Sequence, residues 1–216
     1  MGTAHYHLLT QWPDRYINQS DRRDNGLPYR ACPVVYWFSS TEVMIAEELL
    51  ERYVRGERSF AGITVYAEEY ASLLDGINLT GVNLCGSVLD GDWRGVILAE
   101  AQMCGVIMTG GDLQDGNLSK ANLSGAIITQ CDWTGCNFTD AILCGIAFKQ
   151  TEVCNSDFTR AELRGAFLNE TGLGQSDLTE ANLLGAEGID AAILERMGCI
   201  LHNTRLPSGN LYTTRN

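Results

Sequence analysis

Basic residues, histidines, prolines and long apolar runs are all scarce in this chain of 216 residues. Its 15 Lys and Arg stand against 27 Asp and Glu, for a formal net charge of −12. The chain therefore lacks the positive surface that nucleic acids and anionic membranes require. No stretch approaches the ~20 apolar residues of a membrane span, and the N-terminus lacks the basic and apolar regions of a signal peptide. These absences predict a cytoplasmic protein with reduced thiols that binds neither membranes nor nucleic acid directly.

Histidine is the next scarce residue, and its placement argues against catalysis. The three histidines, His5, His7 and His202, lie outside the central region, so no Ser or Cys there has an evident general base. Cys131 and Cys136 have no histidine near them in the sequence to complete a zinc site, and we interpret them as small buried residues. His5 and His7 are interpreted as part of a mobile terminus rather than as metal ligands. We predict no catalytic site, no cofactor and no metal.

The chain is rich instead in a short repeat with a period of five. Every fifth residue from Trp93 to Leu183 is apolar, which makes 19 consecutive positions. At 45% apolar content, chance gives about one such run in four million. Four leucines between residues 74 and 89 keep the spacing one residue out of phase, so a single deletion separates the two blocks. A small residue precedes each large one by two at 17 of 20 sites from Gly91 to Ala186. This pattern predicts short extended segments with both residues pointing inward and the residue between them pointing outward.

Glycines reveal a longer period, four times the short one. Gly105, Gly125, Gly145, Gly165 and Gly185 recur at every twentieth position, and Gly86 lies one position closer to Gly105 than that spacing requires. Four short segments therefore close one square coil, with a corner glycine that we attribute to a turn requiring positive φ. Residues 74–186 make about 5.5 coils, or about six with a partial coil near residues 60–65. Cys85 and Cys104 lie one coil apart, compatible with a disulfide, but parallel stacking and a reducing compartment favour free thiols.

Sequence outside the repeat predicts caps and an extension. We expect an N-terminal extension over residues 1–38, partly disordered or docked through its apolar segment Val34-Val-Tyr-Trp-Phe38. Ser39 and Glu42 form a capping box that predicts a helix over about residues 40–55, within an N-terminal cap at 39–57. The repeat then occupies 58–186. A short helix over 189–197, within a C-terminal cap and tail at 187–216, covers the other end.

Individual repeats resemble those of a known family. Ala121-Asn-Leu-Ser-Gly125, Ala161-Glu-Leu-Arg-Gly165 and Ala181-Asn-Leu-Leu-Gly185 match or approach the A(D/N)LXX signature of pentapeptide-repeat proteins. Residues 48–60 resemble the lead-in helix of cyanobacterial members, and residues 203–209 resemble their C-terminal ending. The resemblance implies an all-β solenoid, a right-handed quadrilateral β-helix; the spacing alone predicts the four sides but not the hand.

Two columns of outward residues stand out. The acidic stripe comprises Asp92, Asp112, Asp132 and Glu152, and the apolar column comprises Val88, Ile107, Ile127, Ala147 and Phe167. Neighbouring carboxylates about 5 Å apart repel one another, so the stripe either bonds nearby backbone groups, as Asp and Asn ordinarily do in this family, or attracts cations or imitates DNA. The apolar column is either aliphatic stacking between coils or a docking strip for residues 1–38, a second copy or another protein.

Taken together, these features predict a non-catalytic solenoid scaffold that acts by protein–protein contact. Its partner is another protein or a second copy of itself. The alternative is a DNA-mimicking inhibitor or protector of a type II topoisomerase, DNA gyrase, which the resemblance implies through the quinolone-resistance branch of the family. That branch tends to have longer solenoids, sometimes with projecting loops. No loop insertion is evident between residues 93 and 186, which counts against the alternative.

Overall fold

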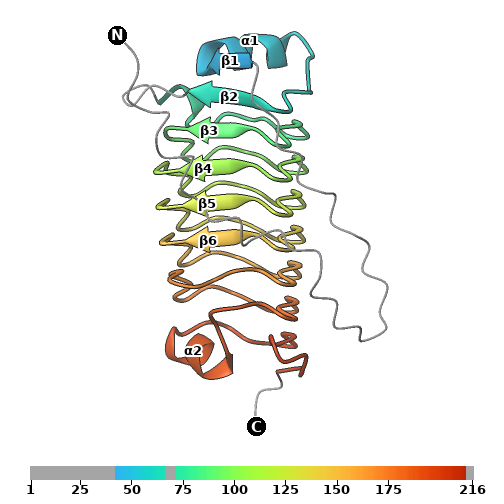
Figure 1. Cartoon of the computed structure of the whole chain (residues 1–216), viewed down its shortest axis with the longest axis vertical. Coiled ribbons are helices and arrows are strands. Elements are labelled where there is room, and N and C mark those ends of the chain that lie inside the picture. Colours follow the sequence, from blue (N-terminus) through green and yellow to red (C-terminus); the bar gives the residue numbers. More distant parts are fainter. Residues whose placement is uncertain (1–41, 67–71, 213–216) are drawn as a thin grey trace, which may run out of the picture. The chain divides into compact units, whose positions relative to one another are not determined.

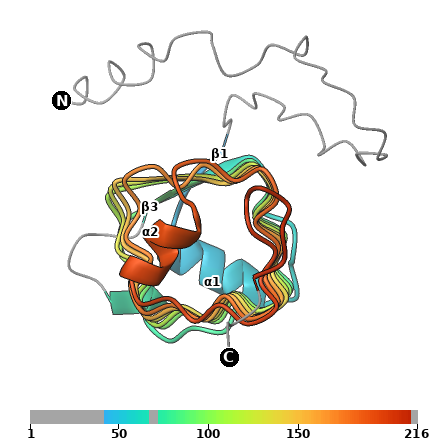
Figure 2. The same ribbon diagram turned by 90° about the horizontal axis from the view of Figure 1, so that it is seen from below.

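The described part of the chain is a stack of square coils (Figure 1). A computed structural model describes residues 42–66 and 72–212. The chain divides into two units, Met1–Ala31 and Cys32–Asn216, and all described residues belong to the second. Seen along the stack, successive coils superimpose as a four-sided outline (Figure 2). The predicted right-handed quadrilateral β-helix is confirmed.

One side of the stack carries the regular strands, and we call it the sheet face. Its six strands pair in parallel in sequence order. They are β1 (Glu42–Ile45), β2 (Ile63–Tyr66), β3 (Val88–Asp90), β4 (Ile107–Thr109), β5 (Ile127–Thr129) and β6 (Ala147–Lys149). The other three sides pair through single parallel bridges between coils. Because each side contributes only a few extended residues before the next corner, the backbone forms a ladder one coil above another on every side.

The register follows the repeat. Val88 pairs with Ile107, and Ile107 pairs with Ile127, so the first of these two steps is one residue shorter than the second. The single deletion between the two blocks is therefore confirmed. One ladder runs from Ser59 to Arg205 through seven successive bridges that join eight residues. The stack is thus longer than the predicted six coils, because segments on both sides of the repeat pair in the same way.

The interior holds the large apolar residues in stacks. Trp133, Phe138, Phe148 and Phe158 are each at most 1% exposed, as predicted. The Phe138 and Phe158 rings stack with centroids 4.7 Å apart, and the Phe148 ring meets Trp133 edge-on at 5.9 Å. The indole nitrogens of Trp93 and Trp133 are buried with no hydrogen-bond partner among the described residues, which costs about 1–3 kcal/mol each. Apolar burial along the whole stack offsets that cost.

The glycine corner has the predicted positive φ, as Gly125 shows. Positive φ occurs at all four corners of the coil and not only at the glycine corner. Glu100, Asp115 and Lys120, for example, adopt φ of 60°, 58° and 58°, close to the 66° of Gly125. A left-handed corner residue therefore suits this backbone whether or not it is glycine. Positive φ alone does not explain why one corner carries glycine in coil after coil.

Small polar residues inside the stack bond carbonyls of the preceding coil. The Ser156 hydroxyl donates to the Trp133 carbonyl at 3.3 Å, and the Thr151 hydroxyl donates to the Ile128 carbonyl at 3.2 Å. Cys136 occupies an equivalent place, with its thiol 3.0 Å from the Leu113 carbonyl. Burial raises the pKa of the Cys136 thiol to about 12, which keeps it protonated. The interpretation of this cysteine as a small buried residue is confirmed.

The N-terminal end departs from the prediction at its first residues. Residues 42–45 form β1 rather than a helix, and α1 (Ala46–Val54) begins only after them. The N-cap of α1 is Ile45 and no side chain caps it, so the predicted capping box is wrong; Ser39 lies outside the described residues. The alternation in Val43-Met-Ile45 buries only Met44, and that period of two favours a strand.

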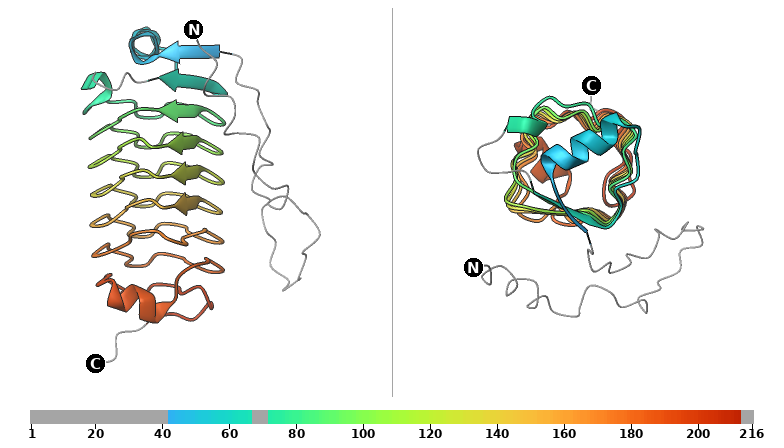
Figure 3. Two further views of the ribbon diagram at one scale, coloured as in Figure 1. Left: turned by 60° about the vertical axis from the view of Figure 1, so that its left-hand side comes forward. Right: turned by 90° about the horizontal axis from the view of Figure 1, so that it is seen from above.

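Helices close both ends of the stack (Figure 3). Helix α1 packs Ala46 and Leu49 against the interior, and a single 3₁₀ turn, η1 (Ser72–Leu74), follows β2 in the fold. At the other end α2 (Ala191–Arg196) lies within the predicted range 189–197 and is capped by Asp190, whose carboxylate accepts from the Ile193 amide at 2.8 Å. After α2 the chain adds further rungs to the ladders before it ends.

Candidate interaction surface

The apolar column lies along the sheet face with its members in direct register. Val88, Ile107, Ile127 and Ala147 are the first residues of β3 to β6, and Ala147 bridges to Phe167. Ile127 is 38% exposed and the other four are half-buried. Each side chain points outward because the next residue along the strand points into the core. The five residues therefore lie on one side of the stack, as predicted.

Apolar surface continues beyond the column at the N-terminal end of the same face. Val43 and Ile45 on β1 are 64% and 50% exposed, and Tyr66 on β2 is 45% exposed. Val43 pairs with Thr64 and Thr64 with Val88, so Val43 heads the same line of residues. The sequence prediction missed these residues because it assigned 42–45 to a helix. Their alternation with buried Met44 is the signal that finds them.

Glycines border the column on one side. The glycine corner comprises Gly86, Gly105, Gly125, Gly145, Gly165 and Gly185, each two positions before an outward residue of the sheet face. A Cβ added at Gly145, Gly165 or Gly185 would meet no atom within 4 Å, so packing does not require glycine there. Since other corners hold charged residues at the same φ, neither space nor backbone conformation requires glycine at these three positions. The effect of the glycine corner is to leave the border of the apolar column without side chains.

Other outward columns are polar and bond their own backbone. Oδ1 of Asn117 accepts from the Ser119 amide at 3.0 Å, and Oδ1 of Asn137 accepts from the Thr139 amide at 2.9 Å. These local bonds stabilise the bend after each outward residue. The aliphatic and aromatic side chains of the apolar column cannot make them. The column thus forgoes a stabilising bond at several consecutive rungs.

Two members of the acidic stripe, Asp92 and Asp132, bond backbone amides, whereas the partners of Asp112 and Glu152 are side chains. Oδ1 of Asp132 accepts from the Thr134 amide at 3.0 Å, and its Oδ2 accepts from Gln114 at 2.5 Å. Arg94 pairs with Asp112 at 2.5 Å. Burial raises the pKa of Asp132, but the bonds from Thr134 and Gln114 and the charge of Arg94 outweigh it and hold the pKa below its usual value.

Asp92 and Glu152, at the two ends of the acidic stripe, also have hydrogen-bond partners within this chain. The Asp112 amide donates to Oδ1 of Asp92 at 3.2 Å, and Arg94 lies 3.5 Å from Asp92. Glu152 at the other end accepts a weak bond from the Cys154 thiol at 3.4 Å. Most of the carboxylates are therefore occupied by groups of this chain.

Cys85 and Cys104 are joined by a disulfide, with Cα atoms 4.6 Å apart. The prediction of two free thiols is wrong. Adjacent rungs of a parallel ladder bring the two Cα atoms within the range that a disulfide spans, so stacking does not prevent the bond. Such a bond persists in oxidising surroundings and would be reduced in a cytoplasm. The bond lies next to Gly86 and Gly105 of the glycine corner.

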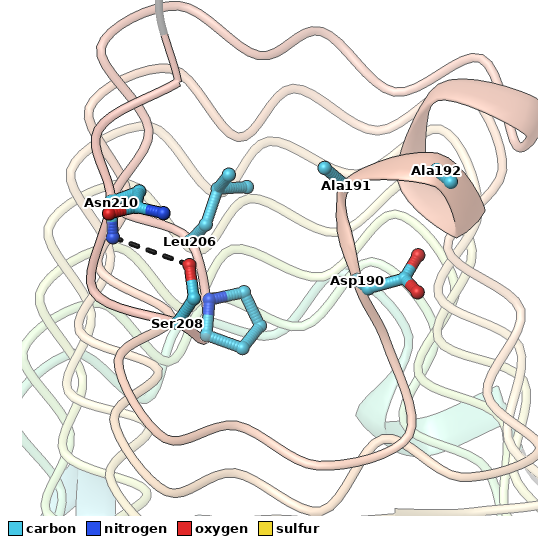
Figure 4. A pocket seen from close by; sticks show the side chains of 7 residues that line it. Asp190, Ala191, Ala192, Leu206, Ser208 and Asn210 are labelled. Atoms are coloured by element: carbon cyan, nitrogen blue, oxygen red, sulfur yellow. Dashed lines mark hydrogen bonds between the residues drawn. The ribbon is translucent and has the colours of Figure 1, made fainter.

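The described residues offer one shallow groove and no metal-binding cluster. A shallow groove of about 410 Å³ lies between the start of α2 and the turn at 206–210 (Figure 4). Its one carboxylate, Asp190, already caps α2. Within residues 42–66 and 72–212, no group of three or more His, Cys, Asp or Glu is placed to hold a metal ion. No helix in the same ranges has the length and apolar character to cross a membrane.

Comparison with known proteins identifies the repeat. Residues 94–125, 117–151 and 155–187 match the family model of pentapeptide repeats, with eight copies. No curated protein matches the chain. Solved structures with similar coils include full-length QnrB1, a plasmid-mediated fluoroquinolone resistance protein, at 15% identity and a TM-score of 0.39 over 59% of this chain. This chain spans only 66% of that protein.

Cyanobacterial structures are also similar. HetL of Nostoc sp. strain PCC 7120, involved in heterocyst differentiation regulation, is 19% identical over 78% of this chain and all of its own, with a TM-score of 0.21. Rfr23 of Cyanothece 51142 is 21% identical over 64% of this chain and 91% of its own, with a TM-score of 0.27. Likenesses with TM-scores this low carry no information on fold, partner or role.

Proposed function

We propose that this chain, whose residues 94–151 and 155–187 match the pentapeptide-repeat family, is a non-catalytic scaffold that binds another protein through its apolar column. The observation that carries the proposal is the unbroken line of outward apolar residues in register on the sheet face. A line of five rungs ~4.8 Å apart is about 19 Å long, enough for a strand or a short helix to lie along it. Apolar strips of this kind on a soluble protein mark binding surfaces.

The glycine corner supports the same proposal. A bound chain must approach the backbone of the sheet face closely to cover Ile107 and Ile127, and side chains at the adjoining corner would obstruct it. Because Gly105 and Gly125 flank these two residues, a partner can extend past the column onto bare backbone. Aliphatic stacking between coils accounts for the column but leaves the glycine corner unexplained.

The experiment compares three forms of the full chain as bait in an extract of the source cell. They are the natural chain, Ile107→Asp/Ile127→Asp, and the matched control Ile97→Asp/Ile142→Asp, which makes the same change at equivalent positions on two other sides. We expect proteins that bind the natural chain and the control but not the column variant. Equal capture by all three forms, with circular dichroism unchanged, would show that the column does not bind the partner.

The DNA-mimic alternative requires carboxylates available to a topoisomerase. Arg94 pairs with Asp112, and Gln114 and Thr134 donate to the two oxygens of Asp132, so few of these oxygens are open to a partner. We therefore expect no inhibition of gyrase supercoiling at micromolar protein. Clear inhibition that weakens with salt and is abolished by Asp112→Asn/Asp132→Asn would favour the alternative over the scaffold.

A further inference from the structure

The sheet face continues directly into the chain segment that precedes it. Strand β1 begins at Glu42, and Val43 heads the line of outward residues that becomes the apolar column. Residues 34–38, Val-Val-Tyr-Trp-Phe, lie only four to eight positions before Glu42 in the sequence. They are the most apolar run that precedes β1, and they belong to the part of the chain outside the described ranges. Their place in the sequence tethers them to the end of the apolar surface.

The reach of this tether matches the first three rungs of the column. An extended chain spans about 3.3 Å per residue, so residue 38 lies within about 13 Å of Glu42 and residue 34 within about 26 Å. Rungs are ~4.8 Å apart, which places Val88 about 10 Å, Ile107 about 14 Å and Ile127 about 19 Å from β1.

We propose that residues 34–38 dock in cis on the apolar column over Val88, Ile107 and Ile127. Short tethers give a high effective concentration, which favours the chain's own segment over a second copy at low protein concentration. Val43, Ile45 and Tyr66 add exposed apolar surface at this end of the sheet face, with Thr64 between Val43 and Val88 in the line. Gly86, Gly105 and Gly125, which have no side chains, lie two positions before Val88, Ile107 and Ile127.

This inference rests on the proposed function in taking the column as a binding surface. A segment bound in cis and a protein partner would compete for the same residues, so the segment would reduce the apparent affinity of the partner. The cis contact is nevertheless measurable on the purified protein without any partner. If it is found while no extract protein depends on the column, the proposed function fails and the inference stands.

The test is hydrogen exchange of the full chain, read by mass spectrometry over peptides that contain residues 34–38. We expect slowing of at least about tenfold in the natural chain, lost in Ile107→Asp/Ile127→Asp. It should be kept in the control Ile97→Asp/Ile142→Asp. Circular dichroism confirms folding of each variant. If the column variant fails to fold, Tyr36→Ser/Trp37→Ser/Phe38→Ser replaces it, because that variant leaves the solenoid untouched and should also lose the slowing.

Trp37 offers an independent reading. In a Trp12→Phe background it is the only tryptophan besides the fully buried Trp93 and Trp133, so quenching by acrylamide reports mainly on Trp37. We expect quenching to rise severalfold in the column variant and to stay unchanged in the control. Unslowed exchange at 34–38 in the natural chain would refute the proposal, as would slowing that survives in the column variant. Slowing that appears only at concentrations where sedimentation detects dimers would assign the column to a second copy instead.

Discussion

Truncating Phe138 is the sharpest test of the interior. The ring is fully buried, stacks on Phe158 at 4.7 Å and lies 6.1 Å from Trp133. Backbone hydrogen bonds to both neighbouring coils fix the spacing of the coils here. The Phe138 amide donates to the Asp157 carbonyl at 2.7 Å, and the Asn137 amide donates to the Gly116 carbonyl at 2.9 Å. The walls cannot close on a cavity, so we expect Phe138→Ala to cost about 3–5 kcal/mol of the free energy of unfolding.

Part of that cost is specific to the aromatic stack. A stacked pair contributes about 0.5–1.5 kcal/mol beyond the area it buries. Phe138→Leu keeps most of the volume and places in this stack the residue found one coil earlier, Leu118. It should therefore cost no more than about 1.5 kcal/mol. Phe167→Ala makes the same chemical change on the outer surface and should cost at most about 1 kcal/mol.

Urea unfolding of the four proteins, followed by circular dichroism and by tryptophan fluorescence, measures these differences. Two probes are needed because repeat proteins can unfold in parts, and only coincident curves justify a single free energy. A Phe138→Ala cost equal to that of Phe167→Ala would refute the assignment of Phe138 to a rigid interior. A cost for Phe138→Leu close to that of Phe138→Ala would instead show that ring stacking dominates over volume.

Three further predictions concern the corners, the disulfide and the surface charges. Gly125→Asn should cost less than about 1 kcal/mol in thermal unfolding, whereas Gly125→Val should cost about 1–3 kcal/mol, because polar residues adopt positive φ more readily than β-branched ones; equal costs would contradict the account of the corners. Reduction of Cys85–Cys104, whose sequence separation is 19, should lower stability by up to about 3 kcal/mol, and thiol titration of the untreated protein should find neither cysteine free. Local hydrogen bonds hold the pKa values of Asp132 and Asp157 below normal against the opposing effect of burial, so the stability they contribute is present above pH ~4 and lost as pH falls below it; an unfolding midpoint that stays constant from pH 7 to pH 2.5 would contradict this.

The stack itself could be predicted because every coil repeats the same local choice. An inward residue such as Phe138 recurs every five positions, and a period of five admits few structures other than short extended segments joined by corners. The shortened step from Val88 to Ile107 was likewise predictable, because one missing residue shifts the whole pattern. Each of these signals is a regularity of spacing that survives without any knowledge of three-dimensional contacts.

The ends could not be predicted in the same way, because they do not repeat. Residues 42–45 precede a genuine helix, and only the single alternation around Met44 distinguishes their strand from a first helical turn. At the other end Ile200 and Arg205 pair with Asp177 and Asn182 after an interruption by α2. The sequence separation between paired residues is 23 there and 20 in the regular coils. A change in separation that occurs only once leaves no repeating pattern in the sequence.

The candidate surface was half predictable. Arithmetic placed Ile107 and Ile127 on one side, since a period of 20 returns every residue to the same face. The sequence alone attributed the corner glycines to positive φ. Only the structure shows that Glu100 and Lys120 at other corners adopt positive φ without being glycine. The disulfide was mispredicted for a different reason: the compartment inferred from composition was given more weight than the geometry of Cys85 and Cys104.

The last few described residues reverse direction, and this has a consequence for assembly. Arg205 forms an antiparallel bridge with Leu211, and the Tyr212 amide donates to the Thr204 carbonyl at 2.7 Å. The ladders of the preceding coils are parallel, so on this side of the stack a further coil from another molecule would meet a strand that runs in the opposite direction. Head-to-tail association of solenoids generates open filaments, and the reversed strand obstructs growth from this end. The molecule can thus present a long row of β-structure along its side without extending into a fibre along its axis.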